Sequence, residues 1–401
     1  MRTKILVAAL LSSFASLSFA ASNVTLYGQL DEGLVVGKAK HSSTTATLKS
    51  GFVGMSRWGI KGVEDLGNGY SVGFTLEQGF LADSGAEHTS GLAFSRESLM
   101  RITGPFGQVA LGRMGALGFA QSTAILRGWA FGTSWGASAW SVGNVHFGRL
   151  NNAVNYVTPS FSGLTLHATY SNGTATDDNK WSDNAHYYGV GAKYTAHNID
   201  ASIIFEAKDN KGVALLEEKQ KALYHITAGG TYNFNGVKPG VIYQYATQED
   251  YYHQHAFGLS VTAPLAGGSA KLGAKYLLRK YDSHYVDLAA LSEKKASVWT
   301  VGAGYEYPFS KRTNLWTYAG YADGAKGWKN EADVNYNGWQ VGLGLHHKFE
   351  VIHCQSYWRE RKSISFALFR YPTTAKNRVG EAFTYPSHTT GHAGLAPSGS
   401  N

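Results

Sequence analysis

Long hydrophobic runs are missing from almost the whole 401-residue chain. No stretch of about 18 apolar residues follows the N-terminal segment, so the sequence does not predict membrane-spanning helices. Cysteine occurs once, as Cys354, and therefore no disulfide framework holds the fold. Proline is also scarce, at 8 residues. These absences leave a protein built from β-strands, including a closed barrel, among the allowed folds.

Acidic residues are missing from one long span, because no Asp or Glu occurs between Ser98 and Thr176. The whole chain nevertheless carries a formal charge of only +8. Arg2 and Lys4 supply +2 of it and residues 350–401 supply +3, which leaves +3 on the part between them. So small an excess over some 330 residues does not favour nucleic acid as a partner.

Glycine and aromatic residues are abundant, with 48 Gly, 24 Tyr, 19 Phe and 10 Trp. Apolar and polar residues alternate along many short segments, such as residues 71–78, where Val72, Phe74 and Leu76 share one face. Seven short turn clusters separate these segments, at residues 64–69, 104–107, 159–163, 195–198, 233–236, 264–269 and 308–313. Longer polar segments lie between them, at residues 81–91, 175–185, 209–221, 246–255 and 323–335.

Short turns at one rim and long loops at the other are typical of an outer-membrane barrel. Seven turns join fourteen strands, and one strand at each end brings the total to about sixteen. The sequence therefore predicts an all-β fold, a transmembrane antiparallel barrel with one face toward lipid and one toward water. A secreted β-sandwich or lectin is the alternative, although its loops would not sort by length.

The two ends of the chain differ from the alternating part. Residues 1–20 combine Arg2 and Lys4 with a short apolar core and the small residues Ser18 and Ala20, which predicts a signal peptide; a short buried helix is the alternative. Residues 350–401 lose the alternation, and we expect a disordered or poorly ordered extension, with an added periplasmic anchor as the alternative. The barrel domain is expected over residues 21–349.

Six segments in order resemble the successive signatures of the trimeric general porins of Gram-negative bacteria, most closely the neisserial and betaproteobacterial type. They are VTLYGQLDEGL (24–34), SRWGIKGVEDLGNGYSVGFTLEQGF (56–80), SRESLMRITGPFGQVALGR (95–113), RLNNAVNYVTPSFSGL (149–164), YEYPFSKRTNLWTYAGY (305–321) and VGLGLHHKF (341–349). The resemblance implies sixteen strands, a homotrimer joined through the first and last strands, and a third external loop folded inward, here residues 115–141. It also implies outer-membrane lipid and lipopolysaccharide as surroundings, and Phe349 as the aromatic residue read by the barrel-assembly machinery.

The resemblance implies a pore constriction lined by charged side chains. Arg57 and Arg96 match its basic positions, and Arg149 or its neighbour Asn151 falls near a third. Lys61 and the loop residue Arg127 add positive charge, and Glu77 and Asp31 point inward as acidic counterparts. Each arginine could instead be a solvated charge paired with a loop carboxylate. Arg101 stands where the family usually has glycine, and alternation turns it outward, so it belongs at a rim or in the trimer contact. Arg113 is the second candidate for trimer contact.

The expected function is passive diffusion of ions and small hydrophilic solutes through a water-filled channel. Because the inward loop has no acidic residue and Asn151 stands where the family often has Asp, we expect a weak preference for anions, although Asn155 replaces a frequent Arg. No cofactor or metal is expected, since His253 with His255 and His346 with His347 lack suitable spacing or surroundings. A barrel-type outer-membrane enzyme or an adhesin is the alternative.

Overall fold

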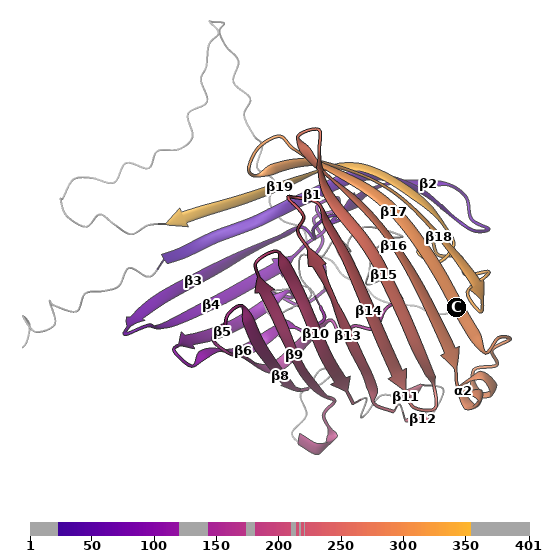
Figure 1. Cartoon of the computed structure of the whole chain (residues 1–401), viewed down its shortest axis with the longest axis horizontal. Coiled ribbons are helices and arrows are strands. Elements are labelled where there is room, and N and C mark those ends of the chain that lie inside the picture. The colour runs from indigo at the N-terminus through magenta and orange to yellow at the C-terminus, as the bar shows by residue number, and fades with distance from the viewer. Residues whose placement is uncertain are drawn as a thin grey trace, which may run out of the picture. The chain divides into compact units, whose positions relative to one another are not determined.

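The computed structural model describes residues 23–119, 143–173, 181–209, 214–215, 218–219 and 221–353. Seventeen of its strands form one sheet, in which β2 is a short strand beside β1 and the other sixteen form the wall of a closed antiparallel barrel. Figure 1 shows the wall strands side by side and tilted, with β1 next to β19. The predicted fold class and strand number are confirmed.

The strands of the wall are long enough to cross the hydrocarbon layer. Their bounds are β1 (Asn23–Ala39), β3 (Arg57–Gly67), β4 (Tyr70–Gly79), β5 (Glu97–Gly104), β6 (Gly107–Gly115), β7 (Arg149–Val157), β8 (Leu164–Asn172), β9 (His186–Ala196), β10 (Ile199–Lys208), β13 (Leu223–Tyr232), β14 (Lys238–Gln248), β15 (Tyr252–Leu265), β16 (Gly268–Tyr281), β17 (Lys295–Pro308), β18 (Thr313–Lys326) and β19 (Gly338–His353). Outside the wall lie β2 (Thr45–Ser50), β11 (Ala214–Leu215), β12 (Glu218–Lys219), the 3-10 helix η2 (Trp181–Asp183) and α2 (Ser283–Leu288). Among the described residues, no helix has both the length and the apolar composition needed to span a membrane.

The barrel closes where β1 meets β19, in a continuous register from Val24 opposite His353 to Ala39 opposite Gly338. The other edge of β1 pairs with β3 near its start and with β2 farther along. The last strand therefore continues four residues beyond Phe349.

All seven predicted short turns connect neighbouring strands at one rim, which we call the turn rim. The turn between β3 and β4 illustrates why its sequence suits it, because Gly67, Asn68 and Gly69 all have positive φ, which glycine and asparagine tolerate. At the opposite loop rim, one expectation is wrong. Residues 246–255 were expected to form a long loop, but β14 and β15 extend into this segment and leave only 249–251 between them, so His253 and His255 lie on a strand.

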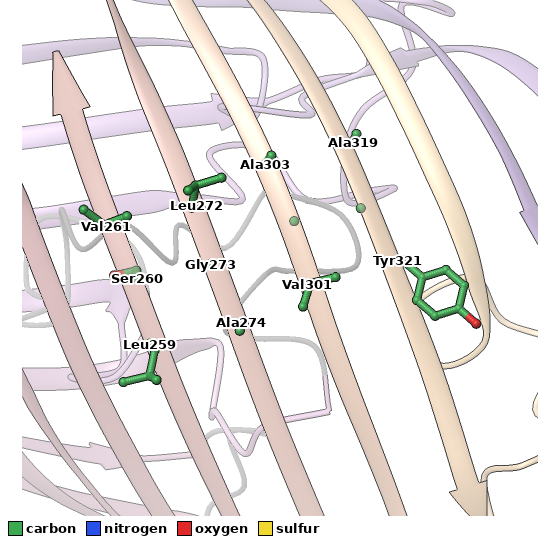
Figure 2. A pocket seen from close by; sticks show the side chains of 12 residues that line it. Leu259, Ser260, Val261, Leu272, Gly273, Ala274, Val301, Ala303, Ala319 and Tyr321 are labelled. Atoms are coloured by element: carbon green, nitrogen blue, oxygen red, sulfur yellow. The ribbon is translucent and has the colours of Figure 1, made fainter. Parts of the chain in front are cut away.

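Burial is inverted relative to a soluble protein. The outer face exposes large apolar side chains such as Leu259, Leu272 and Val190, each more than half exposed, whereas Gln254 and Thr227 on the inner face are fully buried. A shallow apolar depression of about 650 Å³ crosses the outer face of β15 to β18, where alanines leave space between Leu259 and Tyr321 (Figure 2). Apolar residues outside and polar residues inside are the arrangement expected of a barrel in a membrane.

Candidate functional site

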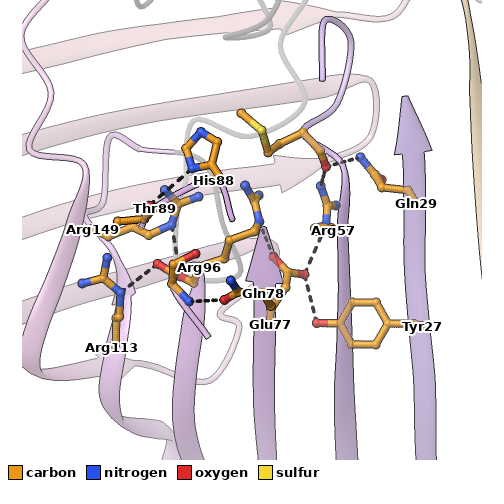
Figure 3. Close-up of polar contacts among 12 residues, drawn as sticks. Tyr27, Gln29, Arg57, Glu77, Gln78, His88, Thr89, Arg96, Arg113 and Arg149 are labelled. Atoms are coloured by element: carbon orange, nitrogen blue, oxygen red, sulfur yellow. Dashed lines mark hydrogen bonds and ion pairs between the residues drawn. The ribbon is translucent and has the colours of Figure 1, made fainter. Parts of the chain in front are cut away.

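Four arginines and one glutamate meet on the inner face of the barrel, and we call them the arginine cluster: Arg57, Glu77, Arg96, Arg113 and Arg149 (Figure 3). Glu77 is at its centre, with one carboxylate oxygen 2.7 Å from Arg96 Nε and the other 3.2 Å from Arg57 Nε. The hydroxyl of Tyr27 donates a third hydrogen bond to Glu77, at 3.0 Å. Strands β1, β3 and β4 carry Tyr27, Arg57 and Glu77, which alternation points toward the lumen, and Arg96 joins them from the position before β5.

The other two arginines of the cluster donate to uncharged oxygens. Arg113 Nε donates to the carbonyl of Ser95 at 2.8 Å, and its Nη1 donates to Asn151 Oδ1. Arg149 Nε donates to the carbonyl of Arg96 at 3.1 Å. Nearby, burial lowers the pKa of His88, and the positive charges of Arg149 and Arg96 lower it further. A histidine with a depressed pKa is neutral at neutral pH, so it does not add to the positive charge there.

The described ends of the segment between β6 and β7 contact lumen-facing side chains. Leu117 N donates to the Tyr187 hydroxyl at 3.2 Å, and that hydroxyl donates to Glu206 Oε1 at 2.6 Å. At the other end, Val145 exchanges two hydrogen bonds with the amide of Gln244, both of 2.9 Å. The start of the segment also reaches the arginine cluster, since the Arg149 guanidinium lies 5.3 Å from the ring centre of Phe119. Residues 120–142, including Arg127, lie outside the described residues.

The outward orientation predicted for Arg101 is wrong. Met100 and Ile102 are the exposed residues of β5, whereas Arg101 lies on the inner face and donates from Nη2 to Thr75 Oγ1 at 3.0 Å. Strict alternation from the inward-facing Arg96 would turn Arg101 outward, but Arg96 precedes β5, and both Arg96 and Glu97 are buried on the inner side. One residue outside the regular strand reverses the assignment of every residue after it.

Arg113 is likewise not a trimer contact in this structure, because its guanidinium belongs to the arginine cluster. The pairing of β6 with β7 shifts register between Gly112 and Met114, and Gly112 has a φ of 129°. This irregularity turns Arg113 inward, although Leu111, two residues earlier, faces outward.

Asp31 points inward as predicted, but it does not line the lumen. Its carboxylate is fully buried and accepts hydrogen bonds from Trp316 Nε1 at 2.8 Å and from Val53 N at 2.6 Å. Phe52 stacks on Trp316 with 4.8 Å between ring centres. Asp31 therefore holds the segment between β2 and β3 against the inner wall and is covered by it.

Lys61 and Phe349 lie near the start of β1, on opposite faces of the wall. Lys61 Nζ is 3.0 Å from Glu350 Oε1 on the inner face. Phe349 is paired with Gly28, and a Cβ added to Gly28 would lie 2.3 Å from the Phe349 ring. The close approach of this ring to the backbone needs glycine at position 28.

Sequence analysis did not single out Tyr27, Tyr187 or Glu206. Tyr27 could have been found, because alternation places it on the same face of its strand as Asp31. Glu206 is a fully buried acidic residue whose Oε2 lies 3.2 Å from His225 Nε2. Within the described ranges, no group of three or more His, Cys, Asp or Glu side chains is arranged to hold a metal ion.

Comparisons with known proteins agree with this architecture. A family model described as "Gram-negative porin" matches residues 7–327. The chain is 26% identical to an outer membrane porin protein of Bordetella pertussis, over 87% of this chain and all of the relative. It is 27% identical to the major outer membrane protein P.IB of Neisseria meningitidis, over 84% of this chain and 98% of the relative. Among solved structures, an anion-selective porin from Comamonas acidovorans matches with a TM-score of 0.60 and 24% identity, covering 82% of this chain and all of that one. The chain is a closed barrel of sixteen strands with a charged lumen, and it matches the family model over most of its length. It is therefore a member of the Gram-negative porin family and forms a channel in the outer membrane.

Proposed function

We propose that the channel conducts small hydrophilic solutes with a weak preference for anions. The observation that carries this proposal is the charge of the arginine cluster, in which four guanidinium groups face two buried carboxylates, Glu77 within the cluster and Glu97 beside it. A few unbalanced charges of one sign in a narrow passage with low-dielectric walls raise the local concentration of the opposite ion.

Two further observations support an anion preference. The span from Ser98 to Thr176 contains no acidic residue, so the segment between β6 and β7, including residue Arg127, cannot oppose the arginines with carboxylates. The start of this segment lies beside the cluster, with Phe119 5.3 Å from the Arg149 guanidinium, which is compatible with an inward-folded loop. The Comamonas relative is described as anion-selective, and we extend that property to this chain as part of the proposal.

The test is the zero-current potential across a KCl gradient in a planar bilayer. The wild type should give the sign of an anion-selective pore, and Arg57→Ser combined with Arg96→Ser should bring the permeability ratio toward unity. Lys238→Ser is a matched control, because Lys238 lies at the turn rim on β14, away from the cluster. A cation-selective wild type, or a double variant with unchanged selectivity, would contradict the proposal.

We also propose a homotrimer that associates through the outer face around β1 and β19. Leu30 and Leu34 lie on that face, 42% and 53% exposed, while the carboxylate oxygens of Glu32 between them are enclosed within the chain. An exposed apolar face of this kind suits packing against another copy of the chain. Conductance that increases in steps of three and migration as a trimer in mild detergent would support this assembly; a monomer that conducts in single steps would contradict it.

Several finer points belong to the same proposal. Residues 1–20 are removed as a signal peptide, which the mass of the mature protein would test. Outer-membrane lipid, lipopolysaccharide and the barrel-assembly machinery are the expected partners, and Phe349 is the expected assembly signal. Transport requires no bond to be made or broken, so purified protein should hydrolyse neither peptides nor phospholipids. Measurable hydrolysis would favour an enzyme, and ligand binding without conductance would favour an adhesin.

A further inference from the structure

A charged cavity lies in the lumen on the side of the arginine cluster that faces the turn rim, and Arg57 and Glu77 belong to both. Its volume is about 550 Å³. It is bordered by β1, β3, β4, β5 and β19 and by the turn between β17 and β18. We call it the basic cavity, and its charged lining residues are Arg57, Lys61, Glu77, Glu97, Arg101, Lys311, Arg312, Lys348 and Glu350. Its volume falls within the range of sites that bind small molecules.

The charges in the basic cavity are unbalanced, with six basic side chains against three acidic ones. Two of the basic residues have a carboxylate beside them, Lys61 with Glu350 at 3.0 Å and Arg57 with Glu77 at 3.2 Å. Glu77 is in addition shared with Arg96, which lies outside the cavity lining. Lys311, Arg312 and Lys348 have no carboxylate oxygen within 4.0 Å in the part of the chain that the structure describes.

Arg101 adds a donor that is not used by the protein. Its Nη2 bonds to Thr75 Oγ1 and its Nε is enclosed, whereas Nη1 is not enclosed and has no hydrogen-bond partner among the described residues. A guanidinium N–H of this kind can donate a short, charge-assisted bond to an anionic oxygen. This donor distinguishes the basic cavity from a patch of solvated lysines.

The cations surround the cavity from different strands on a fixed backbone. Lys348 is on β19 opposite Gln29, and its backbone N donates to the Arg312 carbonyl at 2.8 Å. Ser310 Oγ accepts from Arg312 N at 3.1 Å, which orders the turn that carries Lys311. Arg101 approaches from β5, across the lumen face of β3 and β4. An anion in the cavity would therefore meet donors on more than one side.

We propose that the basic cavity is a binding site for multivalent oxyanions, of the phosphate class, at the turn rim of the channel. It rests on the proposed function in one respect, since anions must enter the lumen. A compact ion with several charged oxygens fits the arrangement better than chloride, because it can accept from Arg101 Nη1 while interacting with Lys311, Arg312 and Lys348 together. Phosphate-bearing solutes are thereby held on their way through the pore, in addition to the preference set by the arginine cluster.

The experiment measures inhibition of chloride current by pyrophosphate, added to both sides of a planar bilayer at fixed ionic strength. Pyrophosphate should reduce the wild-type current in a saturable way. Arg312→Gln combined with Lys348→Gln should raise the half-inhibiting concentration about tenfold, since each removed cation weakens attraction for a multivalent anion severalfold in a water-like dielectric. Lys238→Gln, at the same rim on β14, should leave it unchanged.

The outcomes separate the two proposals. No inhibition of the wild type, or equal inhibition of the wild type and the double variant, would overturn the basic cavity as a binding site. The zero-current potential in KCl, measured on the same proteins, tests the anion preference independently. A cation-selective wild type that is still inhibited by pyrophosphate through Arg312 and Lys348 would refute the proposed selectivity and retain the site.

Discussion

Replacing Glu77 with glutamine removes the carboxylate at the centre of the arginine cluster while keeping the shape of the side chain. Arg57, Arg96 and Tyr27 all donate to that carboxylate, at 2.7 to 3.2 Å. Glutamine keeps one accepting oxygen but turns the other into a donor, which faces a guanidinium unfavourably. Breaking a buried charge network of this kind costs about 3 to 5 kcal/mol of folding free energy.

The effect on conduction follows from one unit of positive charge gained by the lumen. A monovalent ion about 5 Å away in a water-like dielectric interacts with a unit charge by about 0.8 kcal/mol. Screening at 0.1 M salt, with a Debye length of about 10 Å, reduces this to about 0.5 kcal/mol. Because anions gain this energy and cations lose it, the ratio of anion to cation permeability should rise about fivefold.

The assay is the zero-current potential of Glu77→Gln and the wild type across a KCl gradient at about 0.1 M and at about 1 M, where the screening length is near 3 Å and the change in the permeability ratio should fall below about twofold. Glu306→Gln is the control for position, because it removes an inner-face carboxylate that pairs with Lys271 at 2.7 Å outside the cluster, and it should raise the permeability ratio less than Glu77→Gln does. Folded Glu77→Gln channels whose anion preference is unchanged or lower than that of the wild type would refute the reasoning.

Three further changes test other parts of the structure. Arg101→Gln should leave assembly intact and lower the anion preference. Met100→Arg, on the lipid-facing side of the same strand, should destabilise the folded barrel by about 2 to 4 kcal/mol and so lower the folded yield. If Arg101→Gln impaired folding and Met100→Arg did not, Arg101 would face outward. Tyr187→Phe removes the hydroxyl that donates to Glu206 and accepts from Leu117 N, at a cost of about 1 to 3 kcal/mol. It should therefore increase open-channel current noise in single-channel recordings, and a quiet channel would show that the contact between Leu117 and Tyr187 is dispensable. Truncation after His353 should preserve trimers on unheated gels, because the last strand ends there, and their loss would assign a structural role to the residues beyond it.

Much of the fold could be predicted because it depends on local patterns. Alternating side chains and the sorting of short turns from long loops predicted sixteen antiparallel strands, and the structure has them with all seven short turns in place. These features are readable in a sequence because the period of a strand is two residues, and lipid outside with water inside imposes opposite chemistry on the two faces. Arg57, Glu77 and Arg96 were identified as lumen residues from this alternation together with the family resemblance.

Tertiary structure decided what alternation alone could not. Arg101 and Arg113 turn inward because irregular backbone before β5 and at Gly112 changes the parity of the residues that follow, and no residue type announces where such a shift occurs. Asp31 is covered because Phe52, far from Trp316 in the chain, stacks on that ring inside the barrel. The sequence by itself determined the barrel and the charges that its lumen contains. Which charges meet one another depends on strand register and on segments folded against the inner wall, and these are set by contacts between residues distant in sequence.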